Sequence, residues 1–135
     1  MTDLNHDTFT DLEDGTPNLF TAAAIALPIG LGGQFMLAGQ ALFGDSSWDM
    51  HILLGGVIGL AVFMIFGYAV WLPRLRGFMW WASTIVALYL TQVALAAGGP
   101  TTLVFHPFNA ALLLVASVVM AFKVERRKGA SRRLA

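Results

Sequence analysis

The chain has 135 residues, of which 57% are hydrophobic and only 12% are charged, and it contains no cysteine. A soluble domain carries about 25% charged residues, so a chain this apolar needs lipid as part of its solvent. The absence of cysteine excludes disulfides, thiolate metal sites and thiol redox chemistry. The sequence therefore predicts a small integral membrane protein whose partner is the lipid bilayer and which binds no nucleic acid.

The charged residues gather in the two tails and in one loop, and not on an extended basic surface of the kind that binds nucleic acid. Five of the eight acidic residues lie within the first 14 positions, and six of the eight basic residues lie at or after Lys123. We expect residues 1–18 to form a polar, acidic tail that is too polar to pack. Residues 124–135 are expected to form a basic cytoplasmic tail.

Between the tails lie four apolar runs, each close to the length of about 20 residues that crosses a bilayer as a helix. Glycine and proline interrupt the sequence where these runs end. The connections are short, which makes neighbouring helices antiparallel. The sequence thus predicts an all-α, up-and-down four-helix bundle in residues 19–123, with spans at 19–43, 51–72, 78–97 and 107–122.

The positions of lysine and arginine predict the orientation of the bundle. Arg74 and Arg76 lie between the second and third spans, and the other basic residues follow the fourth span. All of them fall on one side of the membrane if the four spans alternate, and that side is expected to be cytoplasmic. Both termini then lie in the cytoplasm of a multi-pass protein, which we place in a bacterial inner (cytoplasmic) membrane.

The strongly polar residues of the spans lie in the half of the bundle that faces away from the cytoplasm. They are Gln34 in the first span, Gln92 in the third, and His51 and His106 at the start of the second and fourth. Polar groups at membrane depth are rare because each needs a partner away from water. One polar site below the outer surface explains this distribution better than a channel or transport path, which needs polar groups at many depths.

The two histidines each begin a helical face that carries small residues. His51, Gly55 and Gly59 are spaced four apart, and Ala110 follows His106 by four, so a flat ring could lie beside either imidazole. The second and fourth helices are diagonal in an up-and-down bundle, which lets the histidines face each other. Two imidazoles on opposite sides of a haem iron form a six-coordinate b-type site. We expect His51 and His106 to ligate the iron of haem b.

Simpler interpretations of the same residues stay open. A histidine at a helix start can merely contact headgroups or water, and glycines spaced four apart commonly let helices pack closely in lipid. Gln34 and Gln92 are expected to hydrogen-bond between helices, although both could also contact a haem edge or a quinone.

A surface metal site is a further alternative, and haem is favoured over it. Asp45 and Asp49 lie near His51 in the chain and could bind zinc or copper together with His106. Residues two apart on a helix diverge, which disfavours Asp49 and His51 as joint ligands. Asp49 could instead accept the second ring N–H of His51.

Four short motifs lie along the spans: Gln34-x-x-Leu37-Ala38-Gly39, Trp48-Asp49-Met50-His51-x-x-x-Gly55, Gln92, and His106-Pro107-x-Asn109-Ala110. Over residues 19–125 this pattern resembles a family of small four-helix integral membrane proteins of uncharacterised function. More distantly, paired histidines on separate helices resemble the transmembrane b-type cytochromes, which implies that His51 and His106 are axial ligands. Many of those cytochromes hold two haems with four histidines, whereas the spans here offer two, so at most one such haem fits.

The sequence therefore predicts a membrane-bound, b-type cytochrome-like protein with one bis-histidine haem near the outer face. It would transfer single electrons, with quinol or a periplasmic carrier as partner, and this role is favoured over that of an enzyme that converts a substrate. The alternative is a cofactor-free accessory or scaffold subunit of a larger membrane complex, or a homo-oligomer. A quinone-binding membrane enzyme is a weaker candidate, and a transporter is the weakest because no charge lies at mid-membrane.

Overall fold

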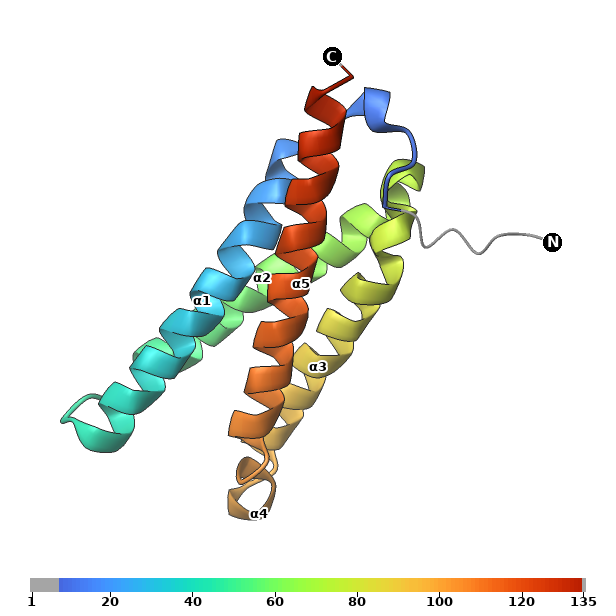
Figure 1. Ribbon diagram of the computed structural model, residues 1–135. Helices are drawn as coiled ribbons and strands as arrows, with labels where there is room; N and C mark the ends of the chain where they lie inside the picture. The colour runs from blue at the N-terminus through green and yellow to red at the C-terminus, as the bar shows by residue number, and fades with distance from the viewer. Residues whose placement is uncertain (1–7, 135) are drawn as a thin grey trace.

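A computed structural model describes residues 8–134 of the chain, and within them four long helices pack side by side as a bundle (Figure 1). This confirms the predicted all-α four-helix bundle. Residues 1–7 of the expected acidic tail lie outside the described part. The long helices are α1 (Asn18–Phe43), α2 (Asp49–Trp71), α3 (Met79–Ala97) and α5 (His106–Arg132), and the short ones are η1 (Leu12–Asp14), η2 (Pro73–Phe78) and α4 (Pro100–Leu103).

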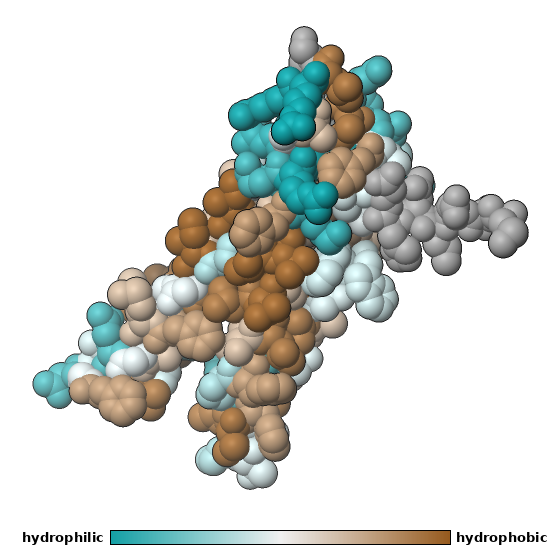
Figure 2. Space-filling view, viewed as in Figure 1, coloured by the Kyte–Doolittle hydropathy of each residue, from teal (hydrophilic) through white to brown (hydrophobic). Residues whose placement is uncertain are grey.

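The long helices carry enough apolar residues to cross a bilayer, with η2 and α3 forming one continuous span. Only 17% to 33% of the most apolar stretch of each helix is buried inside the protein, so most of its side chains face outward. Apolar residues accordingly cover the flanks of the bundle, and hydrophilic residues gather around the end that carries the C-terminus (Figure 2). Such flanks are stable only in hydrocarbon, so the chain is a multi-pass membrane protein.

Glycine and proline mark the ends of the spans, as the sequence indicated. The N–H of Gly44 bonds the carbonyl of Gln40 and closes α1. Pro73, which has no N–H to donate, begins η2 directly after α2 ends. Gly99 has a φ of 85°, which a residue with a side chain rarely adopts, and this lets the chain turn from α3 into α4.

The helices form a ring in the order α1, α2, α3, α5, because α1 and α3 each contact both α2 and α5. Helices α2 and α5 are therefore diagonal, as an up-and-down bundle requires. Gly30 and Gly33 bring α1 close to α2: added Cβ atoms would lie 3.2 Å from Ile58 and 3.3 Å from Leu54. The largest fully buried apolar side chains form the core between the helices: Phe20, Leu27, Ile65, Leu75, Phe78, Ile85, Leu113 and Met120.

The two ends of the bundle differ. The chain segment before α1 and the C-terminal turns of α5 lie together at one end, which we call the basic end (Figure 1). At the opposite end, called the distal end, the α1–α2 hairpin diverges from the α3–α5 hairpin, and a hollow separates the two lobes (Figure 2). Residues 44–48 and α4 form the connections at the distal end. Both candidate ligand histidines begin their helices there.

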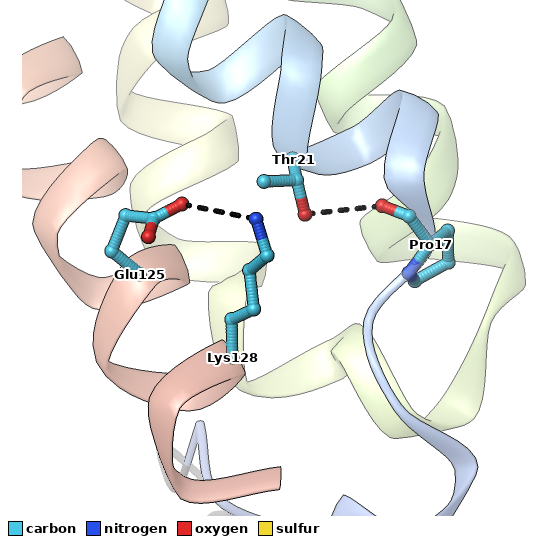
Figure 3. Close-up of polar contacts among 4 residues, drawn as sticks. All are labelled: Pro17, Thr21, Glu125 and Lys128. Carbon is cyan, nitrogen blue, oxygen red and sulfur yellow. Dashed lines mark hydrogen bonds and ion pairs between the residues drawn. The ribbon is translucent and has the colours of Figure 1, made fainter. Parts of the chain in front are cut away.

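Helix α5 extends ten residues beyond the expected end of the fourth span, so the expected basic tail is largely helical. At about 1.5 Å per residue, its 27 residues measure about 40 Å, which exceeds a hydrocarbon core of about 30 Å. Lysine, arginine, glutamate and alanine favour helix in this stretch. Glu125 and Lys128 form an ion pair of 3.7 Å across one turn (Figure 3). The apolar run of the sequence therefore predicts the part of α5 that lies in lipid, whereas the helix itself continues beyond it.

The described part of the acidic segment packs against α5, contrary to the expectation of an unpacked tail. Arg127 is fully buried and donates hydrogen bonds to the carbonyls of Thr8 at 2.8 Å, Thr10 at 2.6 Å and Asp11 at 3.1 Å. Ser131 donates to the carbonyl of Leu12 at 2.6 Å. The acidic side chains do not make these bonds, since main-chain carbonyls are the acceptors. We call residues 8–15 the N-terminal clasp.

The start of α1 continues from this clasp into the membrane-spanning region. Thr21 donates from its hydroxyl to the carbonyl of Pro17 at 3.2 Å, which satisfies one polar group in the first turn (Figure 3). Arg74 of η2 donates to the carbonyl of Asp14 at 2.9 Å. The clasp is thus bonded to two elements of the basic end.

Replacement of Arg127 by Gln is expected to release the N-terminal clasp while the spans stay folded. A hydrogen bond to a charged group contributes about 1.5–3 kcal/mol, so the loss of several should lower the stability of the clasp by about 2–4 kcal/mol. Hydrogen exchange of the Gly15 amide, which bonds the carbonyl of Leu12, should accelerate strongly. Arg133→Gln removes the same charge from an exposed position and should leave this exchange unchanged. Unaltered exchange in Arg127→Gln would contradict the assignment.

Candidate cofactor site

His51 and His106 lie close together across the diagonal of the bundle, one from each hairpin. The centres of their rings are 6.3 Å apart, and the ring planes make an angle of 52°. Neither side chain is fully buried, because both lie at the distal end where the hairpins diverge. Trp48 places its ring edge-on to His51, 5.4 Å away between centres. The two imidazole rings are thus neighbours at the distal end.

Each imidazole is held by a backbone carbonyl of the preceding long helix. Nδ1 of His51 lies 3.2 Å from the carbonyl oxygen of Gln34 on α1, and Nδ1 of His106 lies 3.2 Å from that of Gln92 on α3. A carbonyl oxygen only accepts, so Nδ1 carries the proton and donates in both contacts. In the neutral imidazole, Nε2 of each ring is then the nitrogen without a proton, and its lone pair is the one that a metal would bind.

The amide of Gln34 ties α1 to the start of α2. Its Nε2 donates to the carbonyl of His51 at 2.9 Å. Gln34 and His51 therefore bond each other twice, once through the amide and once through the imidazole. Gln34 Oε1 is buried and accepts no hydrogen bond from the described residues. Because the His51 carbonyl can only accept, the amide nitrogen of Gln34 must face it, and the amide oxygen then points away and has no partner within residues 8–134.

The amide of Gln92 has a different partner. Asn109, one turn after His106, donates from Nδ2 to Gln92 Oε1 at 2.6 Å and to the carbonyl of Leu88 at 2.9 Å. Asn109 is 6% exposed, so these bonds lie inside the bundle between α3 and α5. The predicted interhelical roles of Gln34 and Gln92 match these contacts. Asn109 was not among the predicted site residues, although its position one turn after His106 on the same helix is a usable signal.

A cavity of about 410 Å³ lies between the hairpins at the distal end. Of the residues predicted to bind the cofactor, it is lined by His51, His106, Gln34, Gln92, Gly55 and Ala110. The rest of its wall is mainly apolar and includes Ala38, Gly56, Val93 and Ala96. Among the sequence-predicted set, Gly59 is the residue that does not line the cavity. The structure thus brings the other six residues around one space.

Tyr89 of α3 occupies the place beside Gly59. Its hydroxyl donates to the carbonyl of Gly55 at 3.2 Å, and its ring contacts Phe63 edge-on with centres 6.0 Å apart. A Cβ atom added to Gly59 would collide with the Tyr89 hydroxyl. The predicted glycine stripe is therefore filled by a phenol at Gly59 and approached by the Gln34 amide at Gly55, where an added Cβ atom would lie 3.2 Å from Gln34 Nε2. Tyr89 also lines the cavity and was not among the predicted site residues.

The acidic residues of the α1–α2 connection do not approach the imidazoles. Asp49 accepts a hydrogen bond from the Ser47 hydroxyl at 2.9 Å, and the carbonyl of Gln34 takes the ring N–H of His51 for which Asp49 was considered. Across residues 8–134, no three His, Asp or Glu side chains come together in a group that could hold a metal ion. The site therefore offers two nitrogen ligands and otherwise neutral groups.

Residues 34–99 match the family of unknown function DUF6220. The matched stretch is just under half of the chain; it includes Gln34, His51 and Gln92 and ends before His106. No curated protein and no solved structure matches the chain. The chain is therefore similar over this stretch to a family for which no activity is known.

Replacement of Gly59 by Ala is expected to destabilise the bundle, because the added methyl group displaces the Tyr89 phenol. Overpacking of this kind costs about 1–3 kcal/mol. Gly56→Ala on the same helix meets no atom within 4 Å and should be neutral or slightly stabilising. Tyr89→Phe combined with Gly59→Ala should recover part of the loss, since the hydroxyl is the first atom struck. Thermal unfolding in detergent, followed by circular dichroism, measures all three, and equal melting temperatures for the two alanine variants would refute the packing.

Proposed function

We propose that this protein holds one b-type haem between His51 and His106 and transfers single electrons at the distal face of the membrane. The observation that carries the proposal is the paired arrangement of two imidazoles, each with Nδ1 engaged by a backbone carbonyl and Nε2 free to coordinate. A haem held by His51 and His106 would supply a one-electron couple of its iron.

The separation of the rings supports this ligand set. An imidazole–metal bond is about 2.0 Å long and the ring centre lies about 1.1 Å beyond the bonded nitrogen, so two imidazoles on one metal have centres about 6.2 Å apart. The observed distance is 6.3 Å. Two such rings can rotate about the line that joins them, so the angle of 52° between their planes is compatible with joint ligation.

The surroundings of the pair also suit a flat, mostly apolar cofactor. Cofactor pockets usually enclose about 300–1,000 Å³ and are lined mainly by apolar groups with a few placed polar ones. The distal cavity has a volume of about 410 Å³ and opens between the hairpins. Gly55, Gly56, Ala38, Ala96 and Ala110 line it with small side chains, which leaves room for a planar ring.

The remaining polar groups orient the ligands and carry out no chemistry themselves. The carbonyls of Gln34 and Gln92 fix the tautomer and the direction of each imidazole, as second partners of metal-bound histidines generally do. Asn109 holds the Gln92 amide, and Tyr89 is among the residues that line the cavity. A haem at this site lies near one face only, so its electron partner is a membrane quinol or a carrier in the outer aqueous space.

The distribution of basic residues supports an orientation for this site. Arg74, Arg76 and the C-terminal turns of α5 lie at the basic end, and the positive-inside rule places that end in the cytoplasm. We place the protein in the inner (cytoplasmic) membrane of a bacterium, with both termini cytoplasmic. The distal cavity then faces the periplasm.

A cofactor-free accessory subunit of a larger membrane complex, or a homo-oligomer, is the second candidate. The bonds among Gln34, His51, Gln92 and Asn109 favour it, because they satisfy most polar groups of the distal end without any ligand. In lipid, such interhelical bonds also hold helices together. The two candidates differ in whether the purified protein retains haem.

Replacement of His51 or His106 by Ala is expected to abolish six-coordinate haem binding, because each removes one of two axial nitrogens. The purified wild-type protein, expressed with haem available, should show a Soret band and sharpened visible bands after reduction with dithionite. Either variant should lose this spectrum while still inserting into the membrane. His6→Ala is the matched control, since His6 precedes the first span, and it should keep the spectrum. A colourless wild-type protein would favour the accessory subunit, and an unchanged spectrum in both variants would overturn the ligand assignment.

The proposed orientation can be tested by cysteine labelling, because the natural chain has no cysteine. Ser46→Cys lies in the exposed α1–α2 connection and Arg133→Cys in the exposed end of the chain after α5. A membrane-impermeant maleimide should label Ser46→Cys when only the outer surface of the inner membrane is accessible, and Arg133→Cys only after permeabilisation. The cysteine-free protein gives the background. The reverse labelling pattern would place the distal cavity in the cytoplasm.

A further inference from the structure

A second hollow lies at the basic end, on the opposite side of the membrane from the histidine pair. It has a volume of about 400 Å³ and is lined by Gly77, Trp80, Trp81 and Lys123. Gly77 ends η2 together with Phe78, the two tryptophans belong to the first turn of α3, and Lys123 comes from α5. Three elements thus converge on this space, and the candidate haem site includes none of its residues.

The position of this hollow along the helices is the boundary between hydrocarbon and water. Lys123 directly follows the apolar run of α5 that ends at Phe122, and beyond it α5 carries charged residues in nearly every turn. Trp80 is 65% exposed on the flank of the bundle. Tryptophan and lysine are enriched at this depth because each has an apolar body and a polar tip. The hollow therefore opens where lipid headgroups lie.

The polar side-chain groups of the residues that line the hollow are all hydrogen-bond donors. They are the ammonium of Lys123 and the indole N–H groups of Trp80 and Trp81, and within residues 8–134 none of these three groups has a hydrogen bond or ion pair. The neighbouring Lys128, by contrast, is paired with Glu125 (Figure 3). No acidic residue lines the hollow. An anion with several acceptor oxygens would satisfy all three donors and balance the charge of Lys123.

We propose that this hollow binds the phosphodiester headgroup of an anionic phospholipid from the leaflet at the basic end. The Lys123 ammonium pairs with the phosphate as a point charge, and the indole N–H groups donate to its oxygens. The acyl chains extend along the apolar flank between α3 and α5, toward the centre of the membrane. The proposal does not depend on haem, since the two sites lie at opposite ends of the bundle.

The test is lipid binding to the purified full-length protein in detergent, measured by native mass spectrometry during titration with phosphatidylglycerol. The wild type should retain one phosphatidylglycerol in preference to phosphatidylcholine. Lys123→Gln should weaken this binding about fivefold, the effect of one basic residue near an anionic surface. Lys128→Gln is the matched control: it removes the same charge five residues away and should bind as the wild type does. Trp81→Phe keeps an aromatic ring but removes the indole N–H, and it should also weaken binding.

Three results would overturn the proposal. Equal binding of phosphatidylglycerol by Lys123→Gln and Lys128→Gln would show that general charge, and not this hollow, retains the lipid. Equal retention of phosphatidylcholine would remove the anionic headgroup from the assignment. Displacement of the lipid by millimolar inorganic phosphate would identify a site for the free anion instead. The circular dichroism of each variant should match the wild type, and His51→Ala should bind the lipid normally.

Discussion

Hydrocarbon offers no hydrogen-bond partner, so every polar group that the spans carry below the surface needs one inside the protein. At the distal end, bonds between a side chain on one helix and a backbone carbonyl on the next meet this constraint for most polar groups, with Gln34 Oε1 as the exception in the described part of the chain. His51, His106, Gln34, Asn109 and Tyr89 all donate to such carbonyls. Because the carbonyls belong to rigid helices, they set the direction of each imidazole. The polar edge and the apolar wall of the cavity follow from that arrangement.

The two hairpins repeat one motif with one difference. In each, a glutamine on the first helix presents its carbonyl to a histidine that begins the second, at chain separations of 17 and 14 residues. Three residues after the histidine, α5 carries Asn109 and α2 carries Leu54. Asn109 satisfies the Gln92 amide, and the Gln34 oxygen keeps no partner among the described residues. The halves are alike in how they hold an imidazole and unlike in polarity, so the two faces of a ligand between them meet different surroundings.

Much of the fold could be predicted because the length of an apolar run is set by the thickness of the membrane. The helical face shared by His51 and Gly55 followed from the period of 3.6, and the diagonal placement of α2 and α5 followed from short connections. Other features depend on contacts between distant segments. Arg127 is buried against main-chain carbonyls, which every residue has and no sequence pattern reveals. Tyr89 fills the space beside Gly59 from a third helix, so a stripe of small residues did not mark an empty groove. Helix α5 continues past its apolar run because helix propensity, and not hydropathy, decides where it ends.

The division of the imidazole pair between two hairpins has a consequence for biogenesis. The ribosome delivers the hairpin of α1 and α2 first, and that intermediate exposes His51 alone. The second imidazole arrives only when α5, which follows the other three long helices in the chain, has crossed the bilayer and packed against α1 and α3. A chain that stops before α5 would insert into the membrane but would contain only one of the two proposed ligand nitrogens. The proposed pair of ligands is thus complete only after all four long helices of the bundle have been synthesised and inserted.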